Sequence, residues 1–257
     1  MKVLVLLKEV PVVSAIQIDP ETKRIDRSGA GQMMNPPDAN AIEAALTIAG
    51  SDGSVTAISM GPESCEDVLR QAVGMGAKQA IRVTDSSFAG ADTLVTASVL
   101  KAAADKSGPY DCIVCGAQSI DGQTGQIAAK LGTLMGMGIL TNASAIEKDD
   151  QGLTIERKAG AGYEKLSAPF PVVVSVAEGA NKPRNVSLKG RTAMKKAQIE
   201  VYDSKTLELE GILLQSKSVV TGLAAPDSAQ KGLMITGADD QDSAQKLVDV
   251  LLENHYV

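Results

Sequence analysis

The stretch GAQSIDGQTGQ, residues 116–126, connects the apolar run CIVC at residues 112–115 to a helix-like stretch at residues 127–135. A buried strand that turns directly into a helix is the repeating unit of α/β proteins. The glycines of the turn let backbone amides approach an anion closely, and the helix N-terminus adds partial positive charge. Thr124 can cap the helix or donate its hydroxyl to a phosphate. We therefore predict a phosphate-binding turn.

A carboxylate in the same turn narrows the kind of ligand. Asp121 is unfavourable beside a phosphate unless it accepts hydrogen bonds from backbone amides or from a sugar hydroxyl. A nucleotide supplies both a phosphate and ribose or ribityl hydroxyls. Two other segments, MGPES at residues 60–64 and GADTLVTAS at residues 90–98, also follow predicted strands. Ligands of open α/β sheets bind at the carboxyl ends of the strands, so we expect these three segments to form one nucleotide site.

The rest of the sequence repeats the strand-to-helix pattern. Aromatic residues make up only 2% of the chain and Trp is absent, so aliphatic residues and Met must build the core, as in parallel sheets covered by helices. We predict an α/β fold with an open, mostly parallel, doubly wound, Rossmann-like sheet and an antiparallel ribbon at residues 146–167 on its edge. The predicted strands are 3–7, 55–60, 80–83, 112–115 and 171–176, and the predicted helices are 38–49, 63–73, 92–105 and 124–135.

The character of the chain changes after residue 176. We predict a nucleotide-binding α/β domain at residues 1–200 and a C-terminal extension at residues 201–257, in which only residues 243–253 have helical spacing. We expect this arm to pack on another subunit. One cluster of basic side chains comprises Lys182, Arg184, Lys189, Arg191, Lys195 and Lys196. It is either a solvated helix face or a docking surface for an acidic partner, since the chain is otherwise negative.

Charge and composition exclude several classes of protein. A net charge of −6 argues against a nucleic-acid binder. No apolar run approaches the ~18 to 20 residues that cross a bilayer, so we expect a soluble, cytoplasmic protein without membrane insertion.

Catalytic and metal-binding motifs are also absent from the sequence. The one histidine, His255, lies near the C-terminus, no Cys/His cluster has zinc spacing, and no G-x-G-x-x-G follows the first strand. We predict neither a catalytic residue nor a metal site. In CIVC, Cys112 and Cys115 would face opposite sides of a strand, which favours buried structural thiols over a redox pair.

Several segments together resemble one family, the beta subunit of electron transfer flavoproteins. The resemblance spans nearly the whole chain, and its most specific motif is VCGAQSIDGQTGQI at residues 114–127, which is similar to the family's phosphate-holding loop. Gly160 and Ala161 depart from the beta-subunit signature, which usually has acidic residues there. The other similar segments are VLVLLKEVP at 3–11, MNPPDANAIEAAL at 34–46, SMGPE at 59–63, ERKAGAGYEKLSAPFPVVVSV at 156–176 and NKPRNVSLKGRTAMKKAQIEV at 181–201.

This resemblance implies a fold of the adenine-nucleotide alpha hydrolase type and a larger alpha subunit that holds the redox FAD. Many beta subunits bind AMP structurally, whereas electron-bifurcating members bind a second FAD that accepts hydride from NADH. NPPDANAIEAAL and GADTLVTAS resemble the bifurcating forms more than the mitochondrial type, so the resemblance favours FAD and bifurcation. It implies an electron carrier whose partners are the alpha subunit, an acyl-CoA dehydrogenase or related flavin dehydrogenase, and a low-potential acceptor such as ferredoxin or flavodoxin.

The resemblance also implies roles for particular residues. Thr93 and Thr96, beside Asp92, match positions near the flavin that AMP would not reach. Leu188, in the segment 181–197, matches a recognition-loop leucine that anchors in a dehydrogenase pocket, with Lys189 and Arg191 steering an acidic partner. The nucleotide is expected to contact Leu6, Lys8, Val10, Asn35, Met60 and Gly61 through its adenosine half, and Gly116, Asp121, Gly122, Gln123, Thr124, Gly125 and Gln126 through its phosphates.

Three alternatives use the same predicted loop. The first is a non-bifurcating beta subunit with structural AMP. The second is a free-standing regulatory domain that senses a nucleotide, although the long C-terminal arm and the basic segment indicate a partner. The third is an adenylyl-transferring enzyme on the same fold, but the chain lacks an activating motif such as SGGxDS.

Overall fold

The structure is a computed structural model that describes residues 1–12, 17–18, 25–26, 31–209, 215–218, 221–222 and 232–256. The chain divides into two compact units. Unit 1 comprises Met1–Gln17 and Ile25–Thr221, and unit 2 comprises Ile18–Arg24 and Gly222–Val257. Two short strands, β3 and β4, lie at Gln17–Ile18 and Ile25–Asp26.

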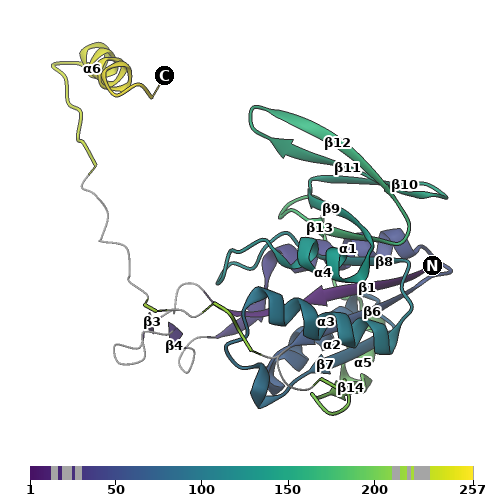
Figure 1. Ribbon diagram of the computed structural model, residues 1–257. Helices are drawn as coiled ribbons and strands as arrows, with labels where there is room; N and C mark the ends of the chain where they lie inside the picture. The colour runs from purple at the N-terminus through teal and green to yellow at the C-terminus, as the bar shows by residue number, and fades with distance from the viewer. Residues whose placement is uncertain are drawn as a thin grey trace. The chain divides into compact units, whose positions relative to one another are not determined.

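Unit 1 is built on a seven-stranded sheet in the order β14-β7-β6-β1-β8-β13-β9 (Figure 1). All neighbouring strands in this sheet run parallel. Its central strands are buried on both faces, which explains their continuous apolar sequences. The strands are β1 (Lys2–Leu7), β6 (Ser54–Met60), β7 (Gln79–Val83), β8 (Cys112–Gly116), β9 (Gly138–Ala143), β13 (Val172–Val176) and β14 (Ile199–Tyr202).

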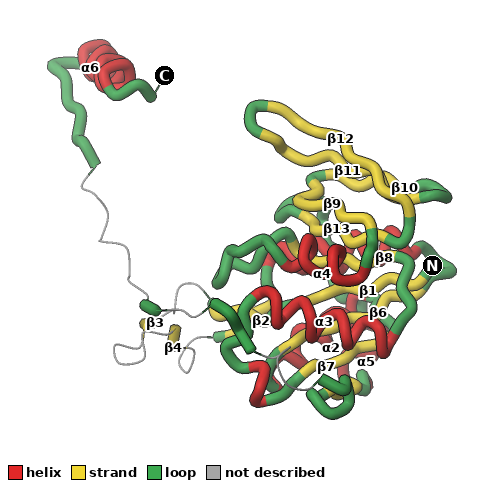
Figure 2. Tube along the Cα trace, in the orientation of Figure 1, coloured by secondary structure: helices red, strands yellow, loops and turns green. Residues whose placement is uncertain are grey.

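Helices cover both faces of this sheet (Figure 2). Helices α1 (Pro36–Ala49) and α2 (Glu66–Met75) pack with the side chains of one face, and α3 (Thr93–Ser107) and α4 (Ile127–Met135) pack with those of the other. The predicted doubly wound α/β fold is therefore confirmed. Short 3-10 turns at Glu63–Cys65 and Ser86–Phe88 precede α2 and α3.

The two cysteines of CIVC lie on opposite faces of β8, as predicted. Cys112 packs into the core beside α1 and α2, and Cys115 into the core beside α3 and α4. Burial raises the pKa of the Cys112 thiol to about 12 and also raises the pKa of Cys115. These thiols are therefore protonated and packed as small apolar side chains at neutral pH.

Two small sheets accompany the main one in unit 1. Strands β10 (Ala145–Lys148), β11 (Gly152–Ala159) and β12 (Gly162–Pro169) form an antiparallel ribbon, as the alternating sequence predicted. Strand β2 (Glu9–Pro11) pairs with β5 (Gln32–Met34), which brings the chain from the end of β1 to the start of α1.

The basic segment forms a helix, α5 (Leu188–Lys196), that packs closely on α2. A Cβ added to Gly190 would lie 2.2 Å from the Gly74 carbonyl oxygen, so glycine permits this approach. The guanidinium of Arg70 donates to the carbonyl of Ala197 at 2.9 Å and makes an ion pair with Glu66 at 3.1 Å. The end of α5 is therefore tied to α2.

Unit 2 contains α6 (Asp240–Glu253), which includes the helix predicted at residues 243–253. Its N-terminus is capped by Asp239, whose carboxylate accepts from the Asp242 amide at 2.8 Å. Among the described residues, no helix is long and apolar enough to span a membrane.

Candidate functional site

The predicted site lies where the strand order changes direction. From β1, the chain proceeds to β6 on one side, and β8 lies on the other side of β1. Leu7 is in register with Ser59 of β6, and Leu6 with Cys115 of β8. The carboxyl ends of these three parallel strands are therefore adjacent, and such a switch point is the usual ligand position in an open α/β sheet.

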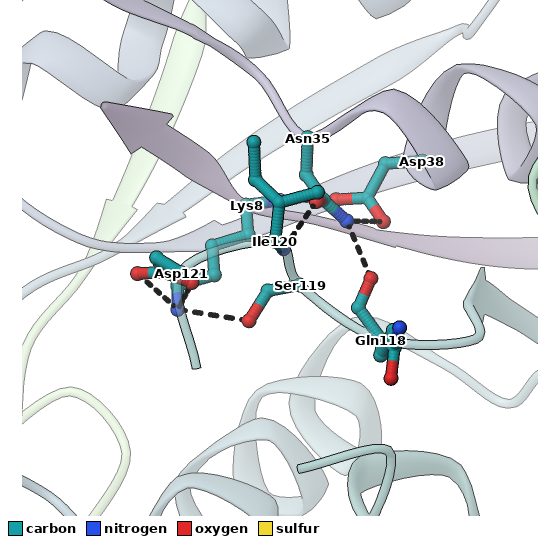
Figure 3. A network of polar contacts seen from close by, with 7 residues as sticks. All are labelled: Lys8, Asn35, Asp38, Gln118, Ser119, Ile120 and Asp121. Atoms are coloured by element: carbon teal, nitrogen blue, oxygen red, sulfur yellow. Dashed lines mark hydrogen bonds and ion pairs between the residues drawn. The ribbon is translucent and has the colours of Figure 1, made fainter. Parts of the chain in front are cut away.

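Asn35, just before α1, joins the ends of β1 and β8 (Figure 3). Its backbone amide donates to the Lys8 carbonyl at 2.9 Å, and its side-chain oxygen accepts from the Ile120 amide at 3.1 Å. Its side-chain nitrogen donates to the Gln118 carbonyl at 3.0 Å. Asn35 is 1% exposed, so these bonds satisfy a buried amide and fix the path of the loop after β8.

Asp38 lies one helical turn further along and is also buried. Its carboxylate accepts from the Lys8 backbone amide at 2.7 Å and from the Asn35 side chain at 2.9 Å. Burial raises its pKa to about 7, while hydrogen bonds from Asn35 and from the backbones of Lys8 and Gly116 act in the opposite direction. The sequence predicts Asp38 only as the first residue of a helix, and does not indicate its contacts with two loops.

An ion pair crosses the mouth of the site. The Lys8 ammonium lies 2.7 Å from a carboxylate oxygen of Asp121 and donates to the Ser119 hydroxyl at 3.3 Å. The side chain of Asp121 is almost buried, whereas that of Lys8 is nearly half exposed. Asp121 was expected to meet backbone amides or a sugar hydroxyl, and Lys8 already partners it here.

The glycine-rich part of the loop is open to solvent. Residues 122–126 are all exposed, and Gln123 and Gly125 have left-handed backbone angles, with φ of 49° and 61°. Helix α4 begins at Ile127, and Gln126 at its cap position makes no side-chain capping bond. Thr124 therefore does not cap the helix. It is exposed together with its neighbours, and the amide of Gln123 donates to the Ser119 carbonyl at 2.8 Å.

A second polar group joins the start of α3 to this loop. The Thr93 hydroxyl donates to the Gln126 side chain at 3.0 Å and accepts from the Lys130 ammonium of α4. Asp92 caps α3 by accepting from the amides of Leu94 and Val95, each at 2.9 Å. The structure thus brings Thr93 to the same loop as Gln123 to Gln126, with half-buried Thr96 one turn further along α3.

The C-terminal part of unit 1 also reaches the start of α3. The Asp92 carboxylate accepts from the amides of Lys217 at 2.9 Å and Ser218 at 3.3 Å, and the Asp92 amide donates to the Ser216 hydroxyl at 2.8 Å. The Asp92 carboxylate therefore accepts hydrogen bonds from several backbone amides, and these bonds lower the pKa of its carboxyl.

The other residues predicted to contact the nucleotide could do so only through their backbone atoms or through partly exposed side chains. The side chains of Leu6 and Val10 are buried in the core, so only their backbones can face a ligand. Met60 is half-buried at the end of β6, and Gly61 allows the chain to pass close to Cys65, whose Cβ would lie 3.3 Å from an added Cβ. Gly116 ends β8 against Asp38.

Comparison with known proteins assigns the family. A family model described as "Electron transfer flavoprotein domain" matches residues 22–207. An electron transfer flavoprotein subunit beta from Thermoanaerobacterium thermosaccharolyticum is 36% identical over the whole of both chains. The chain belongs to the beta-subunit family of electron transfer flavoproteins. Two further relatives of this beta subunit are the caffeyl-CoA reductase-Etf complex subunit CarD from Acetobacterium woodii, 31% identical over the whole of both chains, and the protein FixA from Azorhizobium caulinodans, 32% identical over 91% of this chain and 88% of that one.

The segment of the beta subunit that is predicted to bind a partner, residues 181–197, is separate from the site at the carboxyl ends of the strands. Leu188 begins α5 and is 82% exposed, and Lys189 and Arg191 are exposed beside it. Between α2 and α5 is a groove of about 610 Å³ lined by Asp67, Arg70, Gln71, Val186, Arg191, Met194 and Lys195. Arg184 is engaged instead with Glu43 of α1, at 2.8 Å, and this contact lowers the pKa of the Glu43 carboxyl.

Sequence reasoning missed three polar side chains in this beta subunit. Asp38 and Ser119 lie within quoted motifs. Nothing in the sequence shows that the Asp38 carboxylate accepts from the Lys8 backbone amide or that the Ser119 hydroxyl accepts from the Lys8 ammonium. Lys130 is a helix residue whose contact with Thr93 depends on α3 and α4 being neighbours. Among the residues described, no group of His, Cys, Asp and Glu could hold a metal ion.

Proposed function

We propose that this chain binds FAD as the beta subunit of a heterodimeric electron transfer flavoprotein and passes electrons between NADH, the alpha-subunit FAD and an acyl-CoA dehydrogenase-type partner. We further propose that it does so with flavin-based electron bifurcation, in which a low-potential acceptor such as ferredoxin or flavodoxin takes part. The observation that carries this proposal is the convergence of one loop, residues 116–126, with both the end of β1 and the start of α3.

The donor groups of this loop fit a dinucleotide. Residues 122–126 are exposed, with left-handed backbone at Gln123 and Gly125, and α4 begins directly behind them. The Gln123 amide is used within the loop, where it donates to the Ser119 carbonyl, so the other amides of this stretch would bind a phosphate. Lys8 and Lys130 place a cation on each side of the loop. Bound FAD would supply hydride and electron-transfer chemistry, and the chain's own residues would bind and orient it.

The extent of the polar groups favours FAD over AMP. Lys8, Asn35 and Asp121 lie at the β1 end, while Thr93, Gln126 and Lys130 form a second group at the start of α3. AMP would need only the first group and the loop. A ligand with a second half beyond its phosphates would also use the hydroxyls of Thr93 and Thr96, which are the residues that resemble those of bifurcating members.

The test is the cofactor content of the heterodimer. We expect two FAD per heterodimer in the wild type, and a count close to one in the Thr93→Ala and Thr96→Ala variants. Thr133→Ala is the matched control, because the Thr133 hydroxyl is exposed and bonds to the Ala129 carbonyl of its own helix at 2.8 Å. One FAD with one AMP would support the non-bifurcating alternative, and a chain that purifies as a stable monomer without flavin would support a free-standing regulatory domain.

The exposed Leu188 supports a separate docking role. A side chain of this kind contributes to binding by filling an apolar pocket, and the cations around it would steer an acidic partner. Leu188→Ala should reduce the rate of electron transfer to the dehydrogenase without changing flavin content. Val201→Ala, which truncates another exposed apolar side chain in unit 1, is the control and should leave both unchanged. Loss of flavin in Leu188→Ala would contradict this role.

A further inference from the structure

Asp38 is not among the residues predicted to touch the cofactor, but its contacts join two loops of the site. Its buried carboxylate lies between two loops of the site, bonded to the Lys8 amide at the end of β1 and to Asn35, which in turn holds the loop after β8 (Figure 3). The end of β8 is shaped around it, because a Cβ on Gly116 would lie 2.3 Å from its Oδ1 atom. One carboxylate therefore joins the ends of β1 and β8 to the first turn of α1.

The partners of this carboxylate are all hydrogen-bond donors. They are the Asn35 side-chain amide and the backbones of Lys8 and Gly116. A protonated carboxyl would turn an O–H toward this group of N–H donors, where it would find no acceptor, and one hydrogen bond would be lost. The arrangement therefore suits the ionised form, although burial opposes ionisation.

We propose that Asp38 is a positioning residue whose ionised carboxylate holds the β1 and β8 loops in the conformation that binds a nucleotide, so that nucleotide affinity rises with pH near neutrality. This inference rests on the proposed nucleotide site but adds a control on that site. Asp38 acts through Lys8, Asn35 and Gly116 and does not itself touch the ligand.

The charged and titratable groups around Asp38 do not account for such a pH dependence. The Lys8 ammonium, which pairs with Asp121, favours the ionised carboxylate. The Cys115 thiol of β8 has its pKa raised by burial and by the nearby Asp38 charge, so it stays protonated. The chain has one histidine, His255, which lies in unit 2.

The size of the effect follows from the fraction of molecules that are competent to bind. If only the ionised form binds and Asp38 titrates near pH 7, about one molecule in eleven is competent at pH 6 and about ten in eleven at pH 8. The dissociation constant should therefore be about tenfold higher at pH 6 than at pH 8.

Calorimetric titration of the full chain with ADP-ribose, after removal of bound nucleotide, tests this inference. ADP-ribose has no flavin and its diphosphate does not titrate between pH 6 and pH 8, so a change in affinity reports on the protein. We expect the tenfold dependence in the wild type, in Asp52→Asn and in His255→Gln. Asp52 is an exposed carboxylate just before β6, at the amino ends of the strands and therefore at the opposite end of the sheet from the site.

Asp38→Asn keeps the size of the side chain but removes the charge and one acceptor oxygen. It should bind ADP-ribose weakly at pH 8 and show no change between pH 6 and pH 8. A wild-type affinity that does not depend on pH would overturn the role of Asp38 while leaving the nucleotide site intact, and the wild-type profile gives this answer even if the variant misfolds. A wild type that binds no ADP-ribose at any pH would overturn the proposed nucleotide site itself.

Discussion

Gly116 ends β8 at a place where a larger residue has no room. A Cβ at this position would lie 2.3 Å from Asp38 Oδ1 and 2.9 Å from the Pro37 Cβ. Both neighbours belong to the buried first turn of α1, so they cannot move without disturbing the core. At the scale of single residues, this glycine is as much a part of the site as the polar side chains.

We expect Gly116→Ala to lower the free energy of unfolding by about 1 to 3 kcal/mol, the usual cost of overpacking. Urea unfolding followed by circular dichroism measures this change. Gly122→Ala in the same loop is the matched control, because its Cβ would make only an ordinary contact of 3.4 Å with the Ser119 hydroxyl. Equal stability of the two variants would show that α1 can move far enough to accommodate the added methyl group.

The three cysteines should be unreactive in the folded protein. Cys65, Cys112 and Cys115 are all buried, and burial raises the pKa of each thiol. Because the thiolate is the reactive form, the native chain should show no fast reaction with Ellman's reagent, and guanidinium should release three thiols. A thiol that reacts rapidly in native buffer would contradict the buried structural role.

The sequence predicts which residues bind a nucleotide, but not how they are held in place. The motif NPPDAN contains both Asn35 and Asp38, and its local pattern predicts only that a helix begins there, at residue 38. The bonds that give these two residues their role reach Lys8, 30 residues from Asp38, and Gln118, 83 residues from Asn35. Such pairs are set by sheet topology, which local patterns do not specify.

At the scale of elements, the contact between α2 and α5 depends on small residues from both helices. A Cβ on Gly190 would lie 2.2 Å from the Gly74 carbonyl oxygen, and one on Gly74 would lie 2.6 Å from the Met194 side chain. Arg70 holds the far end of α5 through the Ala197 carbonyl. The exposed Leu188 at the start of α5 is therefore presented by a fixed helix.

Gly190→Ala should displace α5 from α2. Alanine raises helix propensity by about 1 kcal/mol, so a net loss of stability, together with slower electron transfer to the proposed dehydrogenase partner, would identify the clash. Gly162→Ala in β12 is the control, because a Cβ there meets nothing within 4 Å. A more stable Gly190→Ala variant with unchanged transfer would mean that the two helices separate without consequence.

Long apolar and strongly periodic elements were predictable, whereas the edges of the sheet were not. The predicted strands at 3–7 and 112–115 became β1 and β8 because their side chains are buried on both faces. Strands β9 and β14 were missed. Each is an edge strand with few buried side chains, two of six in β9 and one of four in β14, so neither has a continuous apolar run.

At the scale of the whole of unit 1, α1 links the proposed nucleotide site to the segment that leads to α5. Its first turn carries Asp38, and its next turn carries Asn40 and Glu43. Asn40 and Asn181 bond to each other in both directions, at 2.7 and 2.9 Å, and Glu43 accepts from Arg184. One helix thus positions both the strand ends and residues 179–184. A displacement of its first turn would therefore alter the contacts of both groups.

Asp38 also sets how the stability of unit 1 depends on pH. Its pKa is about 7 in the folded chain and 3.8 for an ordinary aspartate, so the folded state binds the proton more tightly. Stability is then lost as pH rises from about 4 to about 7, because the buried carboxylate must ionise. Glu43, Asp92 and Asp203 have lowered pKa values, so their contributions are lost only as pH falls below about 4.

The contribution of Asp38 can be separated from that of the other carboxylates by comparing the wild type with Asp38→Asn at two pH values. Between pH 5 and pH 8 the wild type should lose roughly 2 to 3 kcal/mol of unfolding free energy relative to Asp38→Asn, which has no charge to bury. Urea unfolding of both proteins at the two pH values measures the difference, and Asp52→Asn should follow the wild type. The same variant should bind nucleotide poorly at pH 8, so stability and binding should change in opposite directions. Parallel pH curves for wild type and Asp38→Asn would mean that Asp38 stays ionised throughout and that its hydrogen bonds outweigh its burial.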